Sequence, residues 1–168
     1  MIALKNILVA TDFSEPSDAA VRYGKELAQR FDASLHVLHV VDDLAAHPAP
    51  AAGVLDTGPL QATLVQDARA NLDILLTETV RPGLRARLEV VVAASPSAAI
   101  LAYARDEAID LIVVGTHGRH GLAHFFLGSV AQHVSRSAVC PVLTVRAHAR
   151  DFVVPDAPQP IAREKQTN

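Results

Sequence analysis

Short runs of β-branched and other apolar residues alternate along this sequence with longer segments of helical periodicity. Five runs are predicted to be strands: residues 6–11, 34–41, 87–93, 110–115 and 141–146. The first and fourth runs are almost continuously apolar, which is typical of parallel strands covered by helices on both faces. This alternation predicts βαβ units around one open parallel sheet, because each right-handed crossover packs back onto the sheet. The expected fold class is therefore α/β, with helices on both faces.

Four segments carry apolar residues at helical spacing. These patterns cover residues 20–31, 64–76, 100–108 and 129–136. Ser14 and Ser95 precede two of them, and each is followed closely by a proline. Both serines are expected to cap a helix, because a serine oxygen can accept from the unpaired amides of a first turn. Ala108 is expected on the buried face of the third helix.

Two segments depart from the alternation. Residues 42–59 contain three prolines, two glycines and five alanines, and we expect a mobile connection long enough to act as a flap. Residues 147–168 contain three prolines and few large apolar residues, so this tail is expected to be poorly ordered unless a partner subunit holds it. The length of 168 residues fits one domain, which we place at 1–146.

Composition argues against several classes of function. The net charge of −3 disfavours a broad basic surface for nucleic acid, and no Trp, two Tyr and five Phe provide little for base stacking. No signal segment opens the chain, no apolar stretch approaches the roughly 20 residues that span a bilayer, and there is a single cysteine. We expect a cytoplasmic protein that binds neither nucleic acid nor a membrane.

Glycines are concentrated after the fourth predicted strand. Gly115, Gly118 and the pair Gly128-Ser129 form the pattern G-x2-G-x9-G-S, and Arg119 adds a cation. Glycine amides and a helix amino terminus together favour phosphate binding, although turn-forming glycines explain the pattern equally well. A P-loop motif is missing and the first strand–helix turn has no glycine, which disfavours P-loop ATPases and dinucleotide dehydrogenases.

Two stretches carry a resemblance to a known family. GTHGRHGLAHFFLGSVAQHVSRSAVCPVLTVR and KNILVATDFSEPSDAAV resemble the carboxyl-terminal signature and the first strand and turn of the universal stress protein family, of the UspA-like type. The resemblance covers roughly residues 4–146. It implies an adenine nucleotide α-hydrolase-like fold with strand order 3-2-1-4-5, dimerisation and, in the branch with G-x2-G-x9-G-S, ATP binding with Mg²⁺ or Mn²⁺.

The resemblance also implies site residues. It assigns Asp12 to the ribose and the Val41 backbone to adenine. The ribose and phosphate loop is implied at Gly115, Gly118, Gly128, Ser129 and Val130, and the neighbouring Thr11, His117 and Arg119 complete the expected ATP site. Independently of the family, Asp12 also suits a turn before a helix, and a strand valine is core by default.

Three functions follow as hypotheses: an ATP-binding dimeric regulator of the stress response, with an unidentified regulatory protein partner; a nucleotide-free interaction scaffold; and a slow ATP hydrolase. The loop from Gly115 to Gly128 has no carboxylate, and its bases are histidines such as His117 and His120. We therefore expect slow hydrolysis or none. Dimerisation is predicted through the last strand, which the implied strand order puts at a sheet edge, at Val142, Leu143, Thr144 and Val145.

The remaining candidates have simpler readings. The histidines at 117, 120, 124 and 133 lack the carboxylate or thiolate partner of a catalytic zinc site, so no metal site is predicted there. His36 and His39, three residues apart on one strand, are expected on opposite faces in structural roles. Cys140 is expected to be a small buried hydrophobe, with a redox-sensing thiol as the alternative.

Overall fold

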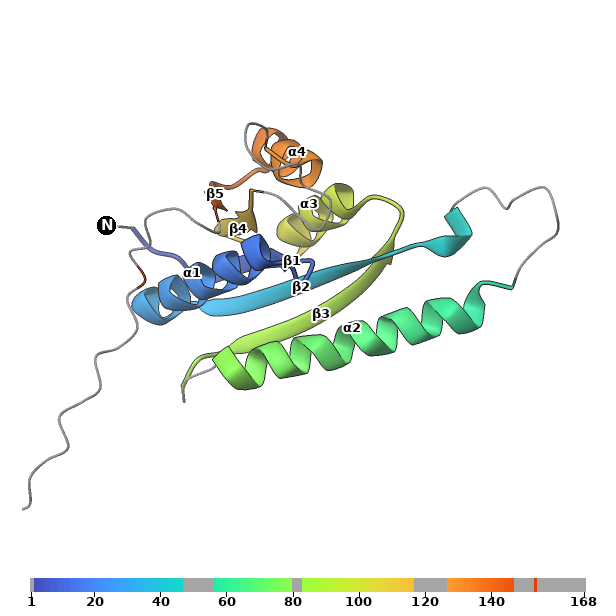
Figure 1. Ribbon diagram of the computed structural model, residues 1–168. Helices are drawn as coiled ribbons and strands as arrows, with labels where there is room; N and C mark the ends of the chain where they lie inside the picture. Colours follow the sequence, from blue (N-terminus) through green and yellow to red (C-terminus); the bar gives the residue numbers. More distant parts are fainter. Residues whose placement is uncertain (1, 47–55, 80–82, 117–126, 147–152, 154–168) are drawn as a thin grey trace, which may run out of the picture.

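The computed structural model describes residues 2–46, 56–79, 83–116, 127–146 and 153. Within them, five strands form one sheet of order β3-β2-β1-β4-β5 in which every neighbouring pair is parallel (Figure 1). The strands are β1 (Asn6–Thr11), β2 (Ser34–Asp42), β3 (Ala86–Ala93), β4 (Leu111–Gly115) and β5 (Val142–Val145). The predicted parallel sheet and its order are confirmed, and each strand lies within a residue of its predicted bounds.

Helices connect the strands. They are α1 (Glu15–Phe31), α2 (Gly58–Thr79), α3 (Pro96–Asp106) and α4 (Ser129–Ser137), with a short 3-10 helix, η1 (Leu44–Ala46), after β2. Ser14 and Ser95 occupy the N-cap positions of α1 and α3, and the Ser95 hydroxyl oxygen accepts from the Ala98 amide at 3.4 Å. The expectation for Ala108 was wrong, because α3 ends earlier. Ala108 is exposed and has a left-handed φ of 48° in the turn that leads to β4.

Two apolar layers cover the sheet. Residues of α1 and α2 pack with one face, around Ile7, Val9 and Leu35, whereas α3 and α4 pack with the other, around Leu8 and Ile112. Each strand alternates its side chains between the two layers, so the central strands need apolar residues at nearly every position. This explains the continuous apolar runs of the sequence. Val153, which lies beyond β5, packs against the α1 layer.

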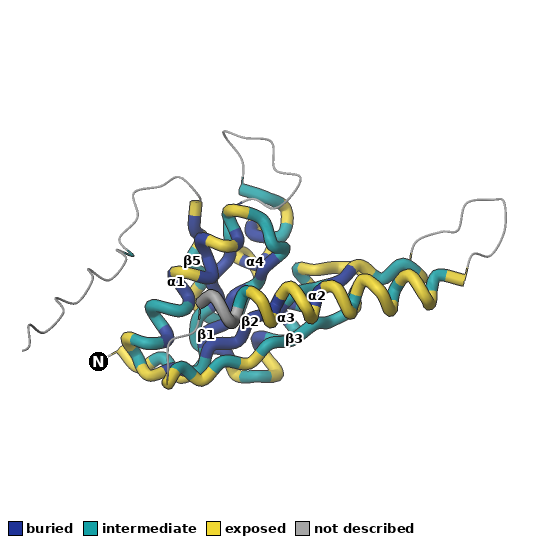
Figure 2. Tube along the Cα trace, turned by 60° about the horizontal axis from the view of Figure 1, so that its bottom comes forward, coloured by how far each residue is buried: buried dark blue, intermediate teal, exposed yellow. Residues whose placement is uncertain are grey.

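The helices differ in burial. Helix α2 buries Ala68 and Leu72 but exposes most of its described length (Figure 2). The connection predicted over residues 42–59 was too long at both ends, because β2 extends to Asp42 and α2 already begins at Gly58. Between them η1 follows β2, and residues 47–55 lie outside the described part of the chain. None of the described helices combines the length and hydrophobicity needed to cross a bilayer.

The strand order determines where a ligand can bind. Strand β1 lies between β2 and β4, so the connections that leave β1 and β4 run toward opposite edges of the sheet. In open α/β sheets this reversal separates the connecting segments and leaves a crevice at the carboxyl ends of the strands.

Candidate functional site

A cavity of about 700 Å³ occupies this crevice. It is lined by every predicted site residue that the structure describes, namely Thr11, Asp12, Val41, Gly115, Gly128, Ser129 and Val130. These residues come from the ends of β1, β2 and β4 and from the start of α4. Residues up to 119 positions apart in the predicted set therefore share one cavity. The others, His117, Gly118 and Arg119, lie outside the described residues.

Hydrogen bonds within the turn fix the segment between β1 and α1. The Ser17 hydroxyl donates to the Ser14 carbonyl oxygen at 2.8 Å, so the contact of 3.1 Å between the Thr11 and Ser17 hydroxyls is donated by Thr11. The Thr11 oxygen also accepts from the amide of Phe13 at 3.1 Å, which stabilises the left-handed φ of 59° at Phe13. Thr11 is buried, and its hydroxyl maintains the turn.

Asp12 has a role in the same turn. Its Oδ1 accepts from the Ser14 amide at 3.2 Å and from the Ser14 hydroxyl. This carboxylate is consequently oriented before any ligand arrives, while the residue also lines the cavity. The turn-forming reading of Asp12 describes this geometry correctly, and a ligand-binding role is compatible with it.

His39 supports the turn from β2. Its Nδ1 donates to the Thr11 carbonyl oxygen at 2.8 Å, because a carbonyl can only accept, and its ring packs on Phe13 with the centroids 4.4 Å apart. His36 faces the other layer, where its Nδ1 lies 2.9 Å from the Tyr103 hydroxyl oxygen. The expectation that these histidines occupy opposite faces is confirmed.

Gly115 ends β4 beneath the first turn of α1. A Cβ at this position would lie 2.8 Å from both the carbonyl carbon and oxygen of Pro16 and 3.0 Å from the Ser17 amide nitrogen. The glycine therefore has a packing reason in addition to any role in ligand approach. The parallel pairing of β4 with β1 brings the end of β4 next to the Asp12 turn, and the missing Cβ of Gly115 lets the first turn of α1 pack closely on it.

The amino terminus of α4 forms another wall of the cavity. Gly128 is its N-cap and forms no side-chain cap, and the next three residues, Ser129, Val130 and Ala131, also line the cavity. The Gly128 amide donates to the Thr116 carbonyl oxygen at 2.7 Å, which joins this terminus to the end of β4. First-turn amides lack acceptors within their helix, and the helix dipole favours an anion beside them.

The sequence did not predict the residues of the cavity wall formed by β2 and α2. Asp42 and His39 at the end of β2, and Asp67 and Asn71 on α2, also line the cavity. Asp42 could have been identified, because it follows a strand at the ligand-binding edge. Asp67 and Asn71, four residues apart on one helix face, gave no such signal because only the packing of α2 beside β2 and β3 brings them to the crevice.

Neither a metal site built from protein side chains alone nor a reactive thiol is indicated in the described part of the chain. No group of three or more His, Cys, Asp or Glu side chains there could hold a metal ion. The histidines at 117, 120 and 124 lie outside it, and His133 is exposed on α4. Cys140 is half-buried, and burial raises the pKa of its thiol, which opposes thiolate formation.

The fold and cavity define a doubly wound α/β protein with a ligand-sized crevice at its switch point. The chain belongs to the universal stress protein family, whose model matches residues 3–146. A universal stress protein of Methanocaldococcus jannaschii is 32% identical over 142 residues, covering 84% of this chain and 82% of the relative. Universal stress protein A homolog 2 of Coxiella burnetii is 33% identical over 143 residues, covering 84% and 94%.

Solved structures of the family share the fold. UspA from Lactobacillus plantarum matches with a TM-score of 0.66 and 30% identity, covering 87% of this chain and 100% of the other. A universal stress protein solved in complex with cAMP matches with a TM-score of 0.61 and 25% identity, covering 87% and 99%. An adenine nucleotide is thus a ligand of one structurally similar protein.

Proposed function

We propose that this universal stress protein binds ATP in the carboxyl-edge cavity and acts as a dimeric, nucleotide-dependent regulator of the stress response. The main observation in support is that three features line one cavity: the oriented carboxylate of Asp12, the strand-end Gly115 and the amino terminus of α4, which has no side-chain cap. The cavity volume of about 700 Å³ lies within the range typical of small-molecule sites. The cAMP complex of a similar protein supports an adenine nucleotide as the ligand class.

The two walls of the cavity favour one orientation of the nucleotide. The amides of Ser129 and Val130 at the start of α4 suit the phosphates, because an anion there is stabilised by the helix dipole. The Asp12 carboxylate suits the ribose hydroxyls, which can donate to it. Asp67 and Asn71 on α2 lie on the β2 side and offer acceptors for the amino group of adenine, beside the Val41 backbone.

A divalent cation bound to the phosphates of ATP fits this arrangement. Mg²⁺ and Mn²⁺ prefer oxygen ligands and are commonly held by one or two carboxylates together with substrate phosphates. The Ser129 hydroxyl, beside the proposed phosphate site, is an oxygen donor of this type in the cavity, whereas Asp12 is assigned to the ribose. When bound, the metal would neutralise phosphate charge.

Slow turnover is the expectation for hydrolysis. Among the described lining residues, Asp42 and Asp67 belong to β2 and α2, while the proposed phosphate site lies at α4 beyond β1 and β4 in the strand order. The Asp12 Oδ1 is occupied by Ser14. The described cavity therefore offers no carboxylate dedicated to activating water at the γ-phosphate.

Two measurements test ATP binding. Nucleotide released on denaturing the purified protein is identified by mass spectrometry, and ATP is titrated by calorimetry with and without Mg²⁺. The matched variant is Gly128→Ser: Gly128 has φ −56° and ψ 151°, which other residues adopt, and serine is a favourable N-cap. Its hydroxyl oxygen would occupy an α4 amide, so ATP affinity should fall about tenfold while the fold persists. Absence of released nucleotide together with no heat of ATP binding would refute the proposal.

The dimer is proposed at β5. The structure confirms that β5 is an edge strand, with Thr144 exposed and Val142 and Leu143 half-buried. Val139, just before the strand, is 74% exposed. An edge with unpaired backbone groups beside an exposed apolar side chain is suited to pairing with a symmetry mate. Light scattering tests this directly, and a monomer at micromolar concentration would contradict it.

A further inference from the structure

A second hollow, of about 330 Å³, lies at the amino ends of the strands, at the edge of the sheet opposite the carboxyl-edge cavity. It is lined by Asn6, Ser34, His36, Arg85, Ala86, Arg87 and Glu107. Strand register explains this gathering: Asn6 pairs with Ser34, and His36 pairs with Arg87, so their side chains lie on the face that α3 covers. Because α3 ends at Asp106, its apolar residues do not extend over this part of the face.

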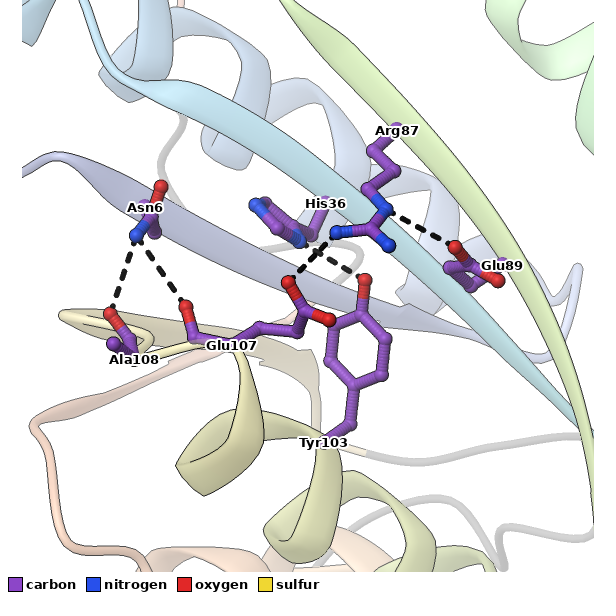
Figure 3. Close-up of polar contacts among 7 residues, drawn as sticks. All are labelled: Asn6, His36, Arg87, Glu89, Tyr103, Glu107 and Ala108. Carbon is purple, nitrogen blue, oxygen red and sulfur yellow. Dashed lines mark hydrogen bonds and ion pairs between the residues drawn. The ribbon is translucent and has the colours of Figure 1, made fainter.

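His36 forms the floor of the hollow. It is only 5% exposed, and its Nδ1 lies 2.9 Å from the Tyr103 hydroxyl oxygen (Figure 3). The other ring nitrogen, Nε2, points away from Tyr103 toward the side of Asn6 (Figure 3) and has no hydrogen-bond partner among the described residues. A nitrogen that has no described partner, on a largely buried imidazole next to a hollow, is a place where a ligand can make a strong hydrogen bond.

The position of the ring proton on His36 depends on the hydrogen bond that His36 makes with Tyr103. Burial raises the pKa of Tyr103 to about 12, so the phenol keeps its proton and can donate it to His36 Nδ1. Burial also lowers the pKa of His36, which favours the neutral ring. In the tautomer in which Nδ1 accepts this bond, the single ring proton resides on Nε2. In that tautomer His36 offers an N–H donor to the hollow.

Two arginines supply further donors at the rim. Arg87 donates through Nη1 to Glu107 at 2.7 Å and through Nε to Glu89 at 3.1 Å, which holds its guanidinium in place and leaves Nη2 without a partner among the described residues (Figure 3). Arg85 bonds Asp32 through Nη2, at the end of α1, and its Nε and Nη1 have no described partner. The lining thus contains two guanidinium groups and one carboxylate, and both guanidinium groups are already ion-paired, so they offer the hollow N–H donors that are not used rather than unpaired charge.

We propose that this amino-edge hollow is a binding site for a small oxyanion, a phosphate or a short carboxylate, held by His36 Nε2 from below and by Arg85 and Arg87 at the rim. The Ser34 hydroxyl in the lining supplies another donor. The volume is about half that of the carboxyl-edge cavity, which favours an anion of a few heavy atoms. This site is separate from the one proposed for ATP and does not depend on it.

The proposal has a distinctive pH signature. An anion on Nε2 stabilises the imidazolium, so binding should raise the pKa of His36, and by linkage affinity should increase as the pH falls. The charged or titratable groups that face His36 are Tyr103 and Glu107 from the α3 side and Arg87 and Glu89 from β3. Acetate is the probe for the pH profile, since its charge stays constant near neutrality whereas that of phosphate changes.

The test is NMR of the imidazole nitrogens of the full chain in an oxyanion-free buffer, with the His36 signal assigned by its loss in His36→Gln. Inorganic phosphate and acetate are titrated separately. We expect at least one to shift the His36 signal saturably and to raise its pKa. Arg87→Gln should weaken binding about tenfold, whereas Arg69→Gln, an exposed arginine on α2, should not. The variant Arg87→Lys keeps a positive charge that can pair with Glu107 but has no Nη2 donor. Weak binding by this variant as well would therefore be due to loss of the Nη2 donor and not to loss of the ion pair.

The outcomes are distinguishable. A response to phosphate alone identifies a tetrahedral anion as the ligand class, and a response to acetate includes carboxylates. If neither anion moves the His36 signal in the folded protein, or if Arg87→Gln and Arg69→Gln bind equally well, the hollow is not an oxyanion site. Gly128→Ser should leave anion binding unchanged, so failure of the ATP proposal and failure of this one are separate results.

Discussion

Replacing Gly115 with alanine tests whether this glycine is required by packing. The new Cβ would lie 2.8 Å from Pro16 backbone atoms, against 3.4 Å for ordinary contact, so the first turn of α1 or the end of β4 must move by several tenths of an ångström. Overpacking of this kind costs about 1–3 kcal/mol. Alanine also lowers the conformational entropy of the unfolded chain, which stabilises the folded protein by about 0.4–1 kcal/mol. The difference between these ranges is about 0–2.6 kcal/mol. Because the clash is with backbone atoms, which cannot rotate away, we expect the free energy of unfolding to fall by about 1–2 kcal/mol.

Urea and thermal denaturation measure this loss. In a chain of this size it corresponds to a decrease in Tm of about 2–8 °C. Because the displaced turn carries Ser14 and Ser17, which hold Asp12 and Thr11, ATP affinity should fall as well. Gly128→Ser is the matched control, since it should lower ATP affinity without lowering stability. An unchanged denaturation midpoint for Gly115→Ala would refute the packing argument and would restore ligand approach as the reason for the glycine.

Other predictions address the site, pH and assembly. Asp12→Asn keeps an Oδ1 acceptor for the Ser14 amide, so stability should hold while calorimetric ATP affinity falls about tenfold; equal losses of stability and affinity would indicate a turn residue only. Burial lowers the pKa of His36 below its ordinary 6.5, so the unfolded chain takes up this proton first. The resulting contribution to stability is present above pH 6.5 and declines as the pH falls toward the folded pKa. In oxyanion-free buffer, His36→Gln should therefore show a flatter dependence of urea-unfolding free energy on pH in that window, and a parallel profile would contradict the shift. Thr144→Lys places like charges at a β5 pair and should convert a dimer to monomer in light scattering, whereas Ala62→Lys on exposed α2 should not; a dimer that survives Thr144→Lys would place the interface elsewhere.

The sequence by itself determined the local elements. Strand and helix formation depends on residues close together in the chain, so the spacing of apolar residues and the capping residues predicted the five strands and four helices. The error at Ala108 arose because α3 ends before this residue, which has a left-handed φ. The strand order and the positions of Asp12 and the Gly128-Ser129 pair came from family resemblance, since residues alone left turn formation equally plausible.

Tertiary structure decided which distant residues meet. Asp67 and Asn71 line the cavity only because α2 packs beside β2 and β3, and Gly115 lies beneath Pro16 only because β4 pairs with β1. The amino-edge hollow likewise depends on the register of His36 with Arg87 and on the length of α3. Such contacts join residues far apart in the chain, and local periodicity carries no information about register, strand order or the point where a covering helix stops.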